Sequence, residues 1–141
     1  MEFFRGQSFS SKDFDQLSLH DSHIHAVRWS HDGHSLTLDL DFIACWEEHS
    51  TGFQFTVAPA ELCFEYADQV RIELEWNKGI SVAQIDTLER HSPSLAPDGE
   101  SLEFIWSLEL SQPAGGISLR ATDFRLTLLE VPVRTSSQSL R

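Results

Sequence analysis

The chain has 141 residues, which is enough for one domain built around a single buried core. Its 22 acidic side chains outnumber the 10 basic ones, so the net charge is −12. Because the summed negative field repels phosphate, this charge argues against nucleic acid and anionic membrane surfaces as partners, and it favours a basic protein or a metal cation.

The negative charge is concentrated in residues 1–119. Residues 120–141 contain four arginines and two acidic side chains, a net charge of +2, which leaves −14 for the rest. No apolar run approaches the roughly 20 residues of a transmembrane helix, and the N-terminus lacks the basic and apolar regions of a signal peptide. We therefore expect a cytoplasmic protein. Cys45 and Cys63 are expected to be free thiols, because they stand in apolar runs without CxxC spacing.

Residues 1–18 are rich in aromatic side chains placed among polar ones. Ser10 is followed three positions later by Asp13, which is the spacing of a helix capping box. We expect a short helical turn or an irregular arm laid over a sheet, with its phenylalanines in the core. A second interpretation makes the apolar face of this arm an interface in a larger assembly, and the sequence leaves the oligomeric state unknown.

Residues 23–42 have the pattern of a β-hairpin. Apolar side chains alternate in residues 24–29 and 36–42, and the Asp32-Gly33 pair between them is typical of a tight turn.

The register of this hairpin follows from its turn. When the residues that flank the turn face each other, His25 lies opposite Leu40 and His23 lies opposite Phe42. Alternate side chains of a strand point to opposite faces of the sheet. Both histidines are therefore expected on the leucine-rich face of the hairpin.

The rest of the chain consists of short strand patterns separated by turns. Strands are expected at residues 42–46, 53–57, 61–66, 70–76, 80–88, 102–110, 117–120 and 124–131. Pro59 should end the strand before it, because proline cannot donate to a ladder. Residues 91–100 contain two prolines and one glycine and form the longest expected loop. The four tryptophans are in phase with the strand faces and are expected in the core.

These elements predict an all-β fold with one domain, residues 1–131. It is an antiparallel meander of about eight or nine strands that forms a sandwich or a partly closed barrel, with a short N-terminal helical turn or arm. Residues 132–141, which are rich in serine, are expected to form a frayed C-terminal tail.

The densest group of chemically active side chains is His20-x2-His23-x-His25 together with Asp21. Two histidines at positions i and i+2 of a strand project from one face, so their imidazoles could share an ion with His20 or Asp21. Three nitrogen ligands and an open position would suit Zn²⁺ or Fe²⁺ and could activate a water. One interpretation is therefore a metal site formed by His20, Asp21, His23 and His25.

A second interpretation gives these residues a structural role. His23 and His25 would be core-edge histidines that bind a backbone carbonyl or Asp21, because buried polar groups need partners. Asp21 would then be a turn residue at the start of the strand. A third interpretation has the histidines bind a non-metal ligand or a partner. The histidine pair also resembles the first pair of a cupin, but residues 27–29 lack the glutamate that follows it there.

Sequence motifs of established catalytic sites are absent from the chain. GxSxG, a glycine-rich phosphate loop and GxGxxG after a strand do not occur. Acidic pairs such as Glu73 and Glu75 fall on the polar face of an amphipathic strand, where solvated carboxylates are expected. The sequence thus favours a protein without catalytic activity and without a cofactor, with a transition metal such as zinc as the alternative.

Four short motifs resemble a group of small bacterial β-proteins of unknown function. They are Leu19-His20-Asp21-Ser22-x-Ile24, Ala58-Pro59-Ala60-x-Leu62-x-Phe64, Trp106-x-Leu108-x-Leu110 and Gly116-Ile117-x-Leu119-x-Ala121. The leucine-histidine-aspartate opening also resembles immunity proteins of bacterial polymorphic-toxin systems, the immunity-protein-50-like group in particular. The resemblance implies a cytoplasmic protein without catalytic activity that is a candidate for binding and neutralising a toxin. Under this resemblance, His20 and Asp21 correspond to structural residues of the family's motif.

Two functional hypotheses follow. The first is a non-catalytic protein-binding module, of the immunity type, in which the charge of residues 1–119 steers association with a basic partner such as a nuclease toxin. The second is a metal- or small-ligand-binding β-barrel that uses the corner formed by His20, His23 and His25.

Overall fold

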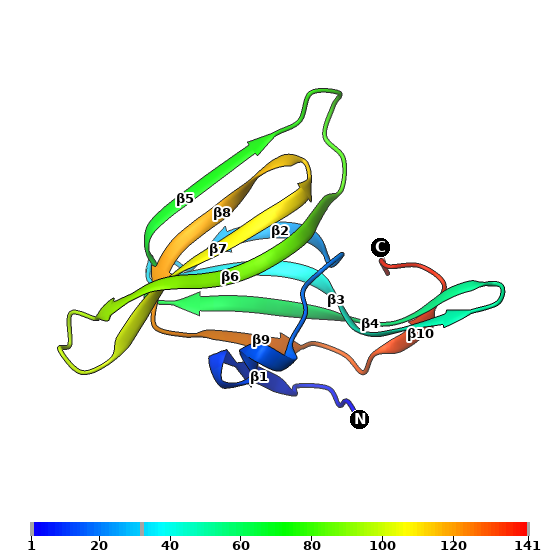
Figure 1. Ribbon diagram of the computed structural model, residues 1–141, viewed down its shortest axis with the longest axis horizontal. Coiled ribbons are helices and arrows are strands. Elements are labelled where there is room, and N and C mark those ends of the chain that lie inside the picture. The colour runs from blue at the N-terminus through cyan, green and yellow to red at the C-terminus, as the bar shows by residue number, and fades with distance from the viewer. Residues whose placement is uncertain (1, 32, 141) are drawn as a thin grey trace.

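The computed structural model describes residues 2–31 and 33–140 and is all-β, as the sequence predicts (Figure 1). The strands of the described part are β1 (Ser8–Ser10), β2 (His23–Trp29), β3 (Ser35–His49), β4 (Gly52–Glu65), β5 (Asp68–Glu75), β6 (Ala83–Leu95), β7 (Leu102–Gln112), β8 (Ala114–Ala121), β9 (Phe124–Leu128) and β10 (Val133–Thr135). The 3-10 helix η1 (Ser11–Gln16) follows β1. Residues 1, 32 and 141 lie outside the described part; they belong to the expected arm, hairpin turn and tail.

The strands form one antiparallel sheet in the order β1-β9-β4-β3-β2-β6-β7-β8-β5, and β10 pairs with β4. Two consecutive meanders, β2-β3-β4 and β6-β7-β8, make up most of it. β2 joins the two halves: it pairs with β3 along most of its length but with β6 only at His23 and Ile24. In Figure 1, β5 to β8 lie on one side of the molecule and β3, β4 and β9 lie on the other.

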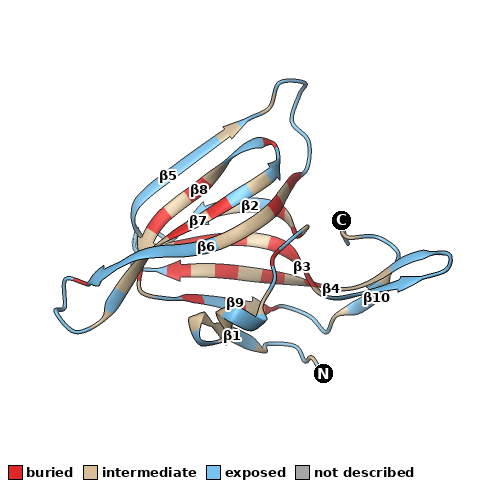
Figure 2. Cartoon of the chain, viewed as in Figure 1, coloured by how far each residue is buried: buried red, intermediate tan, exposed pale blue. Residues whose placement is uncertain are grey.

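The core lies between these two halves. Trp106 of β7 packs edge-on against Phe124 of β9, with ring centroids 5.3 Å apart, and lies 6.0 Å from Phe64 of β4. Its indole N–H donates to the carbonyl of Ala121 over 3.0 Å, so the polar atom of this buried ring is satisfied. Buried residues are frequent in β3, β4, β8 and β9, whereas β5 is exposed along nearly its whole length (Figure 2).

The N-terminal arm forms the short helical turn that the capping-box spacing predicts. The Ser10 hydroxyl accepts from the N–H of Lys12 over 3.3 Å, and the Asp13 carboxylate accepts from the N–H of Ser10 over 3.0 Å. Phe14 of η1 then reaches the core, with its ring 5.5 Å from that of Trp106. No helix in residues 2–31 and 33–140 is long and apolar enough to cross a membrane.

The prediction that Pro59 ends a strand is wrong, because β4 continues through it. Pro59 lies between the last pair with β9, at Ala60, and the first pair with β10, at Val57. Its carbonyl faces that junction and accepts from the N–H of Leu129 over 2.8 Å. In a β-strand, the N–H and C=O of one residue point toward the same neighbouring strand. The N–H that proline lacks would therefore point into the gap between the β4–β9 and β4–β10 ladders.

Half of the long loop expected at residues 91–100 is strand. β6 continues to Leu95, and Pro93 lies where the pairing with β7 shifts register, between His91 and Ser94. A bulge tolerates proline because one residue there is left out of the ladder. The actual turn is short, and it is closed by a hydrogen bond of 2.8 Å from the N–H of Ala96 to the carbonyl of Ser101.

The frayed tail expected at residues 132–141 is not what the described residues show. Val133–Thr135 form β10, which pairs with β4. Beyond β10, the side chain of Gln138 donates to the carboxylate of Asp21 over 3.1 Å, and Ser139 and Leu140 reach β3. The tail is therefore held at two points beyond its strand.

Candidate functional site

β2 contains a bulge that changes where the predicted histidines point. From Ala26 to the hairpin turn, β2 pairs with β3 in the expected register. Between Ile24 and Ala26 the register shifts, so that Ile24 lies opposite Leu40 and His25 is the extra residue. Ile24, which is buried, therefore takes the place on the leucine face that was predicted for His25. The prediction that His23 and His25 project from the leucine face is wrong.

The two histidines lie instead beside Asp41, on the other face of the sheet. His23 is the cross-strand partner of Asp41, and Nε2 of His25 lies 2.8 Å from Oδ2 of Asp41. The same oxygen accepts hydrogen bonds of 2.9 Å from the Ser139 hydroxyl and from the N–H of Leu140. The C-terminal tail thus covers Asp41, which is fully buried.

The hydrogen bonds around Asp41 keep its carboxylate charged. Burial acts to raise the pKa of Asp41, but the bonds from His25, the Leu140 N–H and the Ser139 hydroxyl outweigh burial and hold the pKa below its ordinary value of 3.8. Hydrogen bonds to an ionised acceptor are stronger than those between neutral groups. Asp41 is therefore a structural junction between β2, β3 and the C-terminal tail.

His23 is a second polar group enclosed at this junction. Its Nδ1 is buried, and no hydrogen-bond partner reaches it among the described residues. Burial lowers the pKa of His23 below its ordinary value of 6.5, and His25 lowers it further, while Asp41 and Asp21 act in the opposite direction. The imidazole of His23 is therefore neutral at pH 7.

His20 and Asp21 make a separate set of contacts. Nδ1 of His20 lies 2.9 Å from the backbone carbonyl of Asp86, and Nε2 lies 3.4 Å from the carboxylate of Asp21. Asp21 has a positive φ of 67°, a conformation that aspartate tolerates in turns. Its carboxylate accepts hydrogen bonds from the side chains of Gln84 and Gln138. Asp21 is thus a turn residue, as the structural interpretation had it.

The four predicted metal ligands are not brought together as one site. His20 contacts Asp21 and Asp86, whereas His25 contacts Asp41. In residues 2–31 and 33–140, no group of three or more His, Cys, Asp or Glu side chains is placed to hold a metal ion. Cys45 and Cys63 are free. The described contacts place His23 and His25 where β2, β3 and the tail meet, and they place His20 beside β6.

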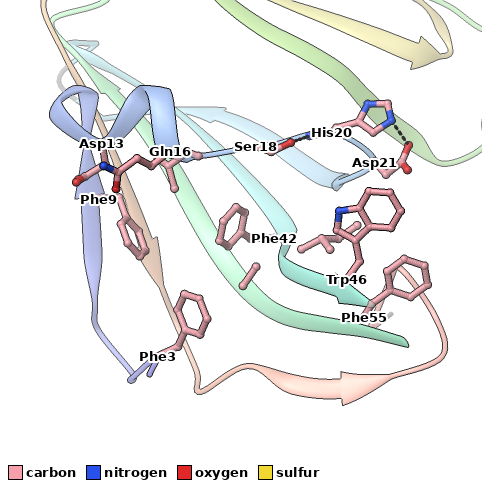
Figure 3. A pocket seen from close by; sticks show the side chains of 13 residues that line it. Phe3, Phe9, Asp13, Gln16, Ser18, His20, Asp21, Phe42, Trp46 and Phe55 are labelled. Carbon is pink, nitrogen blue, oxygen red and sulfur yellow. Dashed lines mark hydrogen bonds and ion pairs between the residues drawn. The ribbon is translucent and has the colours of Figure 1, made fainter. Parts of the chain in front are cut away.

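A groove lined by aromatic rings opens between the N-terminal arm and the β3–β4 hairpin (Figure 3). Its volume is about 240 Å³. Phe3 and Phe9 come from the N-terminal arm, Phe42 from the middle of β3, and Trp46 and Phe55 from the far part of the hairpin. We call this feature the aromatic groove.

One rim of the aromatic groove is polar. It carries Asp13, Gln16, Ser18, His20 and Asp21. This rim exists because residues 17–22 cross from η1 to β6, where the N–H of Asp21 donates to the carbonyl of Ile85 over 2.8 Å. The 13 described residues that line the groove include two aspartates and no lysine or arginine.

The opposite wall belongs to the end of the β3–β4 hairpin, residues 44–56, which we call the hairpin tip. The β2–β3 ladder ends at Asp41 and the β4–β9 ladder ends at Ala60, so β10 is the described strand that pairs with the tip (Figure 1). Trp46 and Phe53 lie on one face of the tip with ring centroids 5.7 Å apart. They are 64% and 44% exposed, although both are large apolar side chains.

Sequence reasoning did not assign these aromatic residues to a site. Trp46 and Trp29 were expected in the core, and both are exposed. The prediction failed because residues 42–46 lose their alternation, which was interpreted as burial on both faces. Residues 47–52, which lie between the strands expected at 42–46 and 53–57, form the end of a long hairpin, and they include the acidic Glu47 and Glu48.

Comparison with protein-family models, with curated proteins and with solved structures found no match to this chain. The resemblance to immunity-protein-50-like proteins therefore stays a prediction from the four short motifs.

Proposed function

We propose that the protein is a non-catalytic protein-binding module whose aromatic groove takes a partner segment with an apolar anchor flanked by basic side chains. The observation that carries this proposal is the exposure of Trp46 and Phe53 on a hairpin tip that extends past the β2–β3 and β4–β9 ladders and pairs with β10. Single exposed apolar residues are common, but rings gathered beside a groove are typical of an interaction surface.

The apolar part of the surface is preorganised. The ring of Phe53 lies 5.7 Å from Trp46 and 6.2 Å from Phe55, so each ring restricts the movement of the next. The side chain of Phe42 forms a buried floor. A partner that binds here orders few side chains, and this reduces the entropy cost of association. Tryptophan is also enriched among the residues that contribute most to binding.

The negative charge of the chain favours basic side chains on either side of the apolar anchor in the partner segment. The net charge is −12, and Asp13 and Asp21 stand at the groove without a lysine or arginine among its described lining residues. Basic side chains beside the anchor would meet a favourable potential, which raises the association rate more than the affinity. The immunity-type role implied by the four motifs is one form of this proposal, with a basic toxin as the partner.

Selection of short peptides from a random display library tests the proposal. We expect enrichment of peptides with Trp, Phe or Leu beside Lys or Arg, bound more weakly at high salt because screening shortens the range of the charges. The substitution Trp46→Ala should weaken the selected peptides by about thirty-fold, or about 2 kcal/mol, as for a central interface tryptophan. Titration calorimetry measures the change.

A matched control separates loss of the groove from general damage. Ile80→Ala removes another exposed apolar side chain, 88% exposed, which does not line the groove. It should leave peptide affinity unchanged, and thermal melting should show that both variants stay folded. The proposal is wrong if the selected peptides bind wild type and Trp46→Ala equally, or if acidic peptides are enriched.

A further inference from the structure

The sheet ends in two edges of different character. At one edge, β1 has three residues and leads directly into η1. At the other, β5 has eight residues, and no strand in the described part of the chain pairs with its outer side. β5 pairs with β8 in regular register over five consecutive residues, from Arg71 to Glu75. It therefore offers a row of backbone N–H and C=O groups to another strand.

Apolar side chains accompany this edge. Ile72 is the cross-strand partner of the buried Ile117, so it lies on the core side of the sheet, as does Val70. Yet Val70 and Ile72 are 43% and 39% exposed. A hollow of about 370 Å³ adjoins them, and Trp29, which is 73% exposed, is among its lining residues. The apolar layer thus continues to the edge of the molecule, where its described side chains are partly exposed.

We propose that β5 is a self-association surface, on which β5 of a second copy of this chain docks antiparallel with a two-fold axis through Ile72. The occupant is identified by charge complementarity. In this register Arg71 of each copy lies opposite Glu73 of the other, and Val70 lies opposite Leu74. Opposite charges in cross-strand positions stabilise a sheet, and like charges there destabilise it.

The neighbouring registers are excluded by the same residues. A shift by two residues in one direction places Arg71 opposite Arg71, and a shift in the other direction places Glu73 opposite Glu73. A shift by one residue joins the apolar face of one copy to the polar face of the other. Within one chain the Arg71 guanidinium already lies 2.7 Å from the Glu73 carboxylate, so both side chains are held on the outer face.

Charge variants in sedimentation equilibrium test the association. Wild type should form dimers in a concentration-dependent manner. Arg71→Glu places four carboxylates together and should weaken the dimer at least tenfold, while Ile72→Lys should leave monomers. The double variant with Arg71→Glu and Glu73→Arg restores opposite charges in the same register, and it should restore the dimer.

Cysteine substitution tests the register itself. Residue 72 of the two copies would lie directly opposite, with Cα atoms about 4.5 to 5.5 Å apart, which allows a disulfide. Residue 70 would be four residues from its counterpart, roughly 13 Å along the strand, which does not. In a background with Cys45→Ser and Cys63→Ala, mild oxidation should therefore link Ile72→Cys into dimers and leave Val70→Cys monomeric.

The outcomes separate this proposal from the binding function. A wild type that stays monomeric at every concentration overturns self-association, and equal linkage of Ile72→Cys and Val70→Cys overturns the register. A charge-swapped double variant that fails to dimerise while staying folded overturns the role of Arg71 and Glu73. None of the β5 residues lines the aromatic groove, so peptide affinity should be the same in all these variants.

Discussion

Asp41 is the residue at which distant parts of the chain meet. A buried carboxylate is costly unless it is paired and hydrogen-bonded. Here one oxygen accepts from β2 through His25 and from the tail through Ser139 and Leu140. The tail therefore supplies two of the three described hydrogen bonds that offset the burial of this charge, and this couples the ordering of residues 136–140 to the stability of the sheet.

The buried His23 makes stability depend on pH. Its pKa is lower in the folded protein than in the unfolded chain, so the unfolded chain takes up the proton first. The free energy of unfolding should therefore be highest above pH 6.5 and should fall as the pH drops below 6.5 toward the folded pKa, by at most about 1.4 kcal/mol for each pH unit. Asp41, whose pKa is also lowered, adds a second loss below pH 3.8. Urea unfolding at a series of pH values measures both.

Two substitutions test whether the loss of stability below pH 6.5 comes from His23. His23→Gln removes the titrating group and should flatten the slope between pH 5 and pH 6.5 relative to wild type. The exposed His31 provides the control, because His31→Gln should leave the slope as it is. An unchanged slope in His23→Gln would show that burial of this imidazole does not couple to folding.

The histidine corner shows which part of the β2–β3 register could be predicted from the sequence and which could not. The register from Ala26 to the turn followed correctly from the turn and the alternating pattern. The bulge at His25 has no such signal, because no glycine or proline marks it in residues 22–29. One extra residue moves every side chain before it to the opposite face. The face predicted for His23 and His25 was wrong for that reason.

Among the elements, the C-terminal tail has the clearest energetic role. Deleting residues 136–141 removes the hydrogen bonds of Ser139 and Leu140 to the charged Asp41, and it admits water that replaces part of them. We expect a loss of about 2 kcal/mol in the free energy of unfolding, the range of a bond to a charged group. Ser139→Ala should cost less, because the Leu140 N–H remains. A deletion without cost would mean that the tail contributes nothing to the stability of the sheet.

The contact of β8 with β5 depends on Gly115. Its φ is +128°, and a Cβ at this position would meet the backbone carbonyl of Glu73 at a distance no real contact allows. Gly115→Ala should therefore destabilise the protein by at least about 2 kcal/mol. Gly79 also has a positive φ, of +85°, but its Cβ would meet no atom within 4 Å, so Gly79→Ala should cost less. Thermal unfolding of the two variants tests this prediction. Equal losses of stability in Gly115→Ala and Gly79→Ala would contradict the steric explanation.

Element boundaries were predictable where alternation is uninterrupted and less so at prolines. The strand expected at 102–110 corresponds to β7, and the helical turn followed from Ser10 and Asp13. Pro59 and Pro93 were interpreted as breaks, although each falls where a ladder has a gap or a bulge. Whether a proline ends a strand depends on what pairs beside it, and that is not a local property of the sequence.

For the whole molecule, a period of two was sufficient to predict an all-β antiparallel fold. It could not give the strand order, because β5 pairs with β8 and β4 pairs with β9 and β10 across long stretches of sequence. The aromatic groove depends on that order, since β1 of the N-terminal arm pairs with β9, which pairs with β4 of the hairpin. Composition predicted the charge of a partner, but only the topology shows where apolar contact is available.

The distribution of the tryptophans gives the protein a built-in optical reporter. Trp106 is 1% exposed and should emit at short wavelength whatever binds, whereas Trp46 stands in water at the wall of the groove. With Trp29 and the partly buried Trp76 replaced by Phe, the long-wavelength emission comes mainly from the hairpin tip. Occupation of the groove then becomes visible as a blue shift of intrinsic fluorescence, without any attached dye.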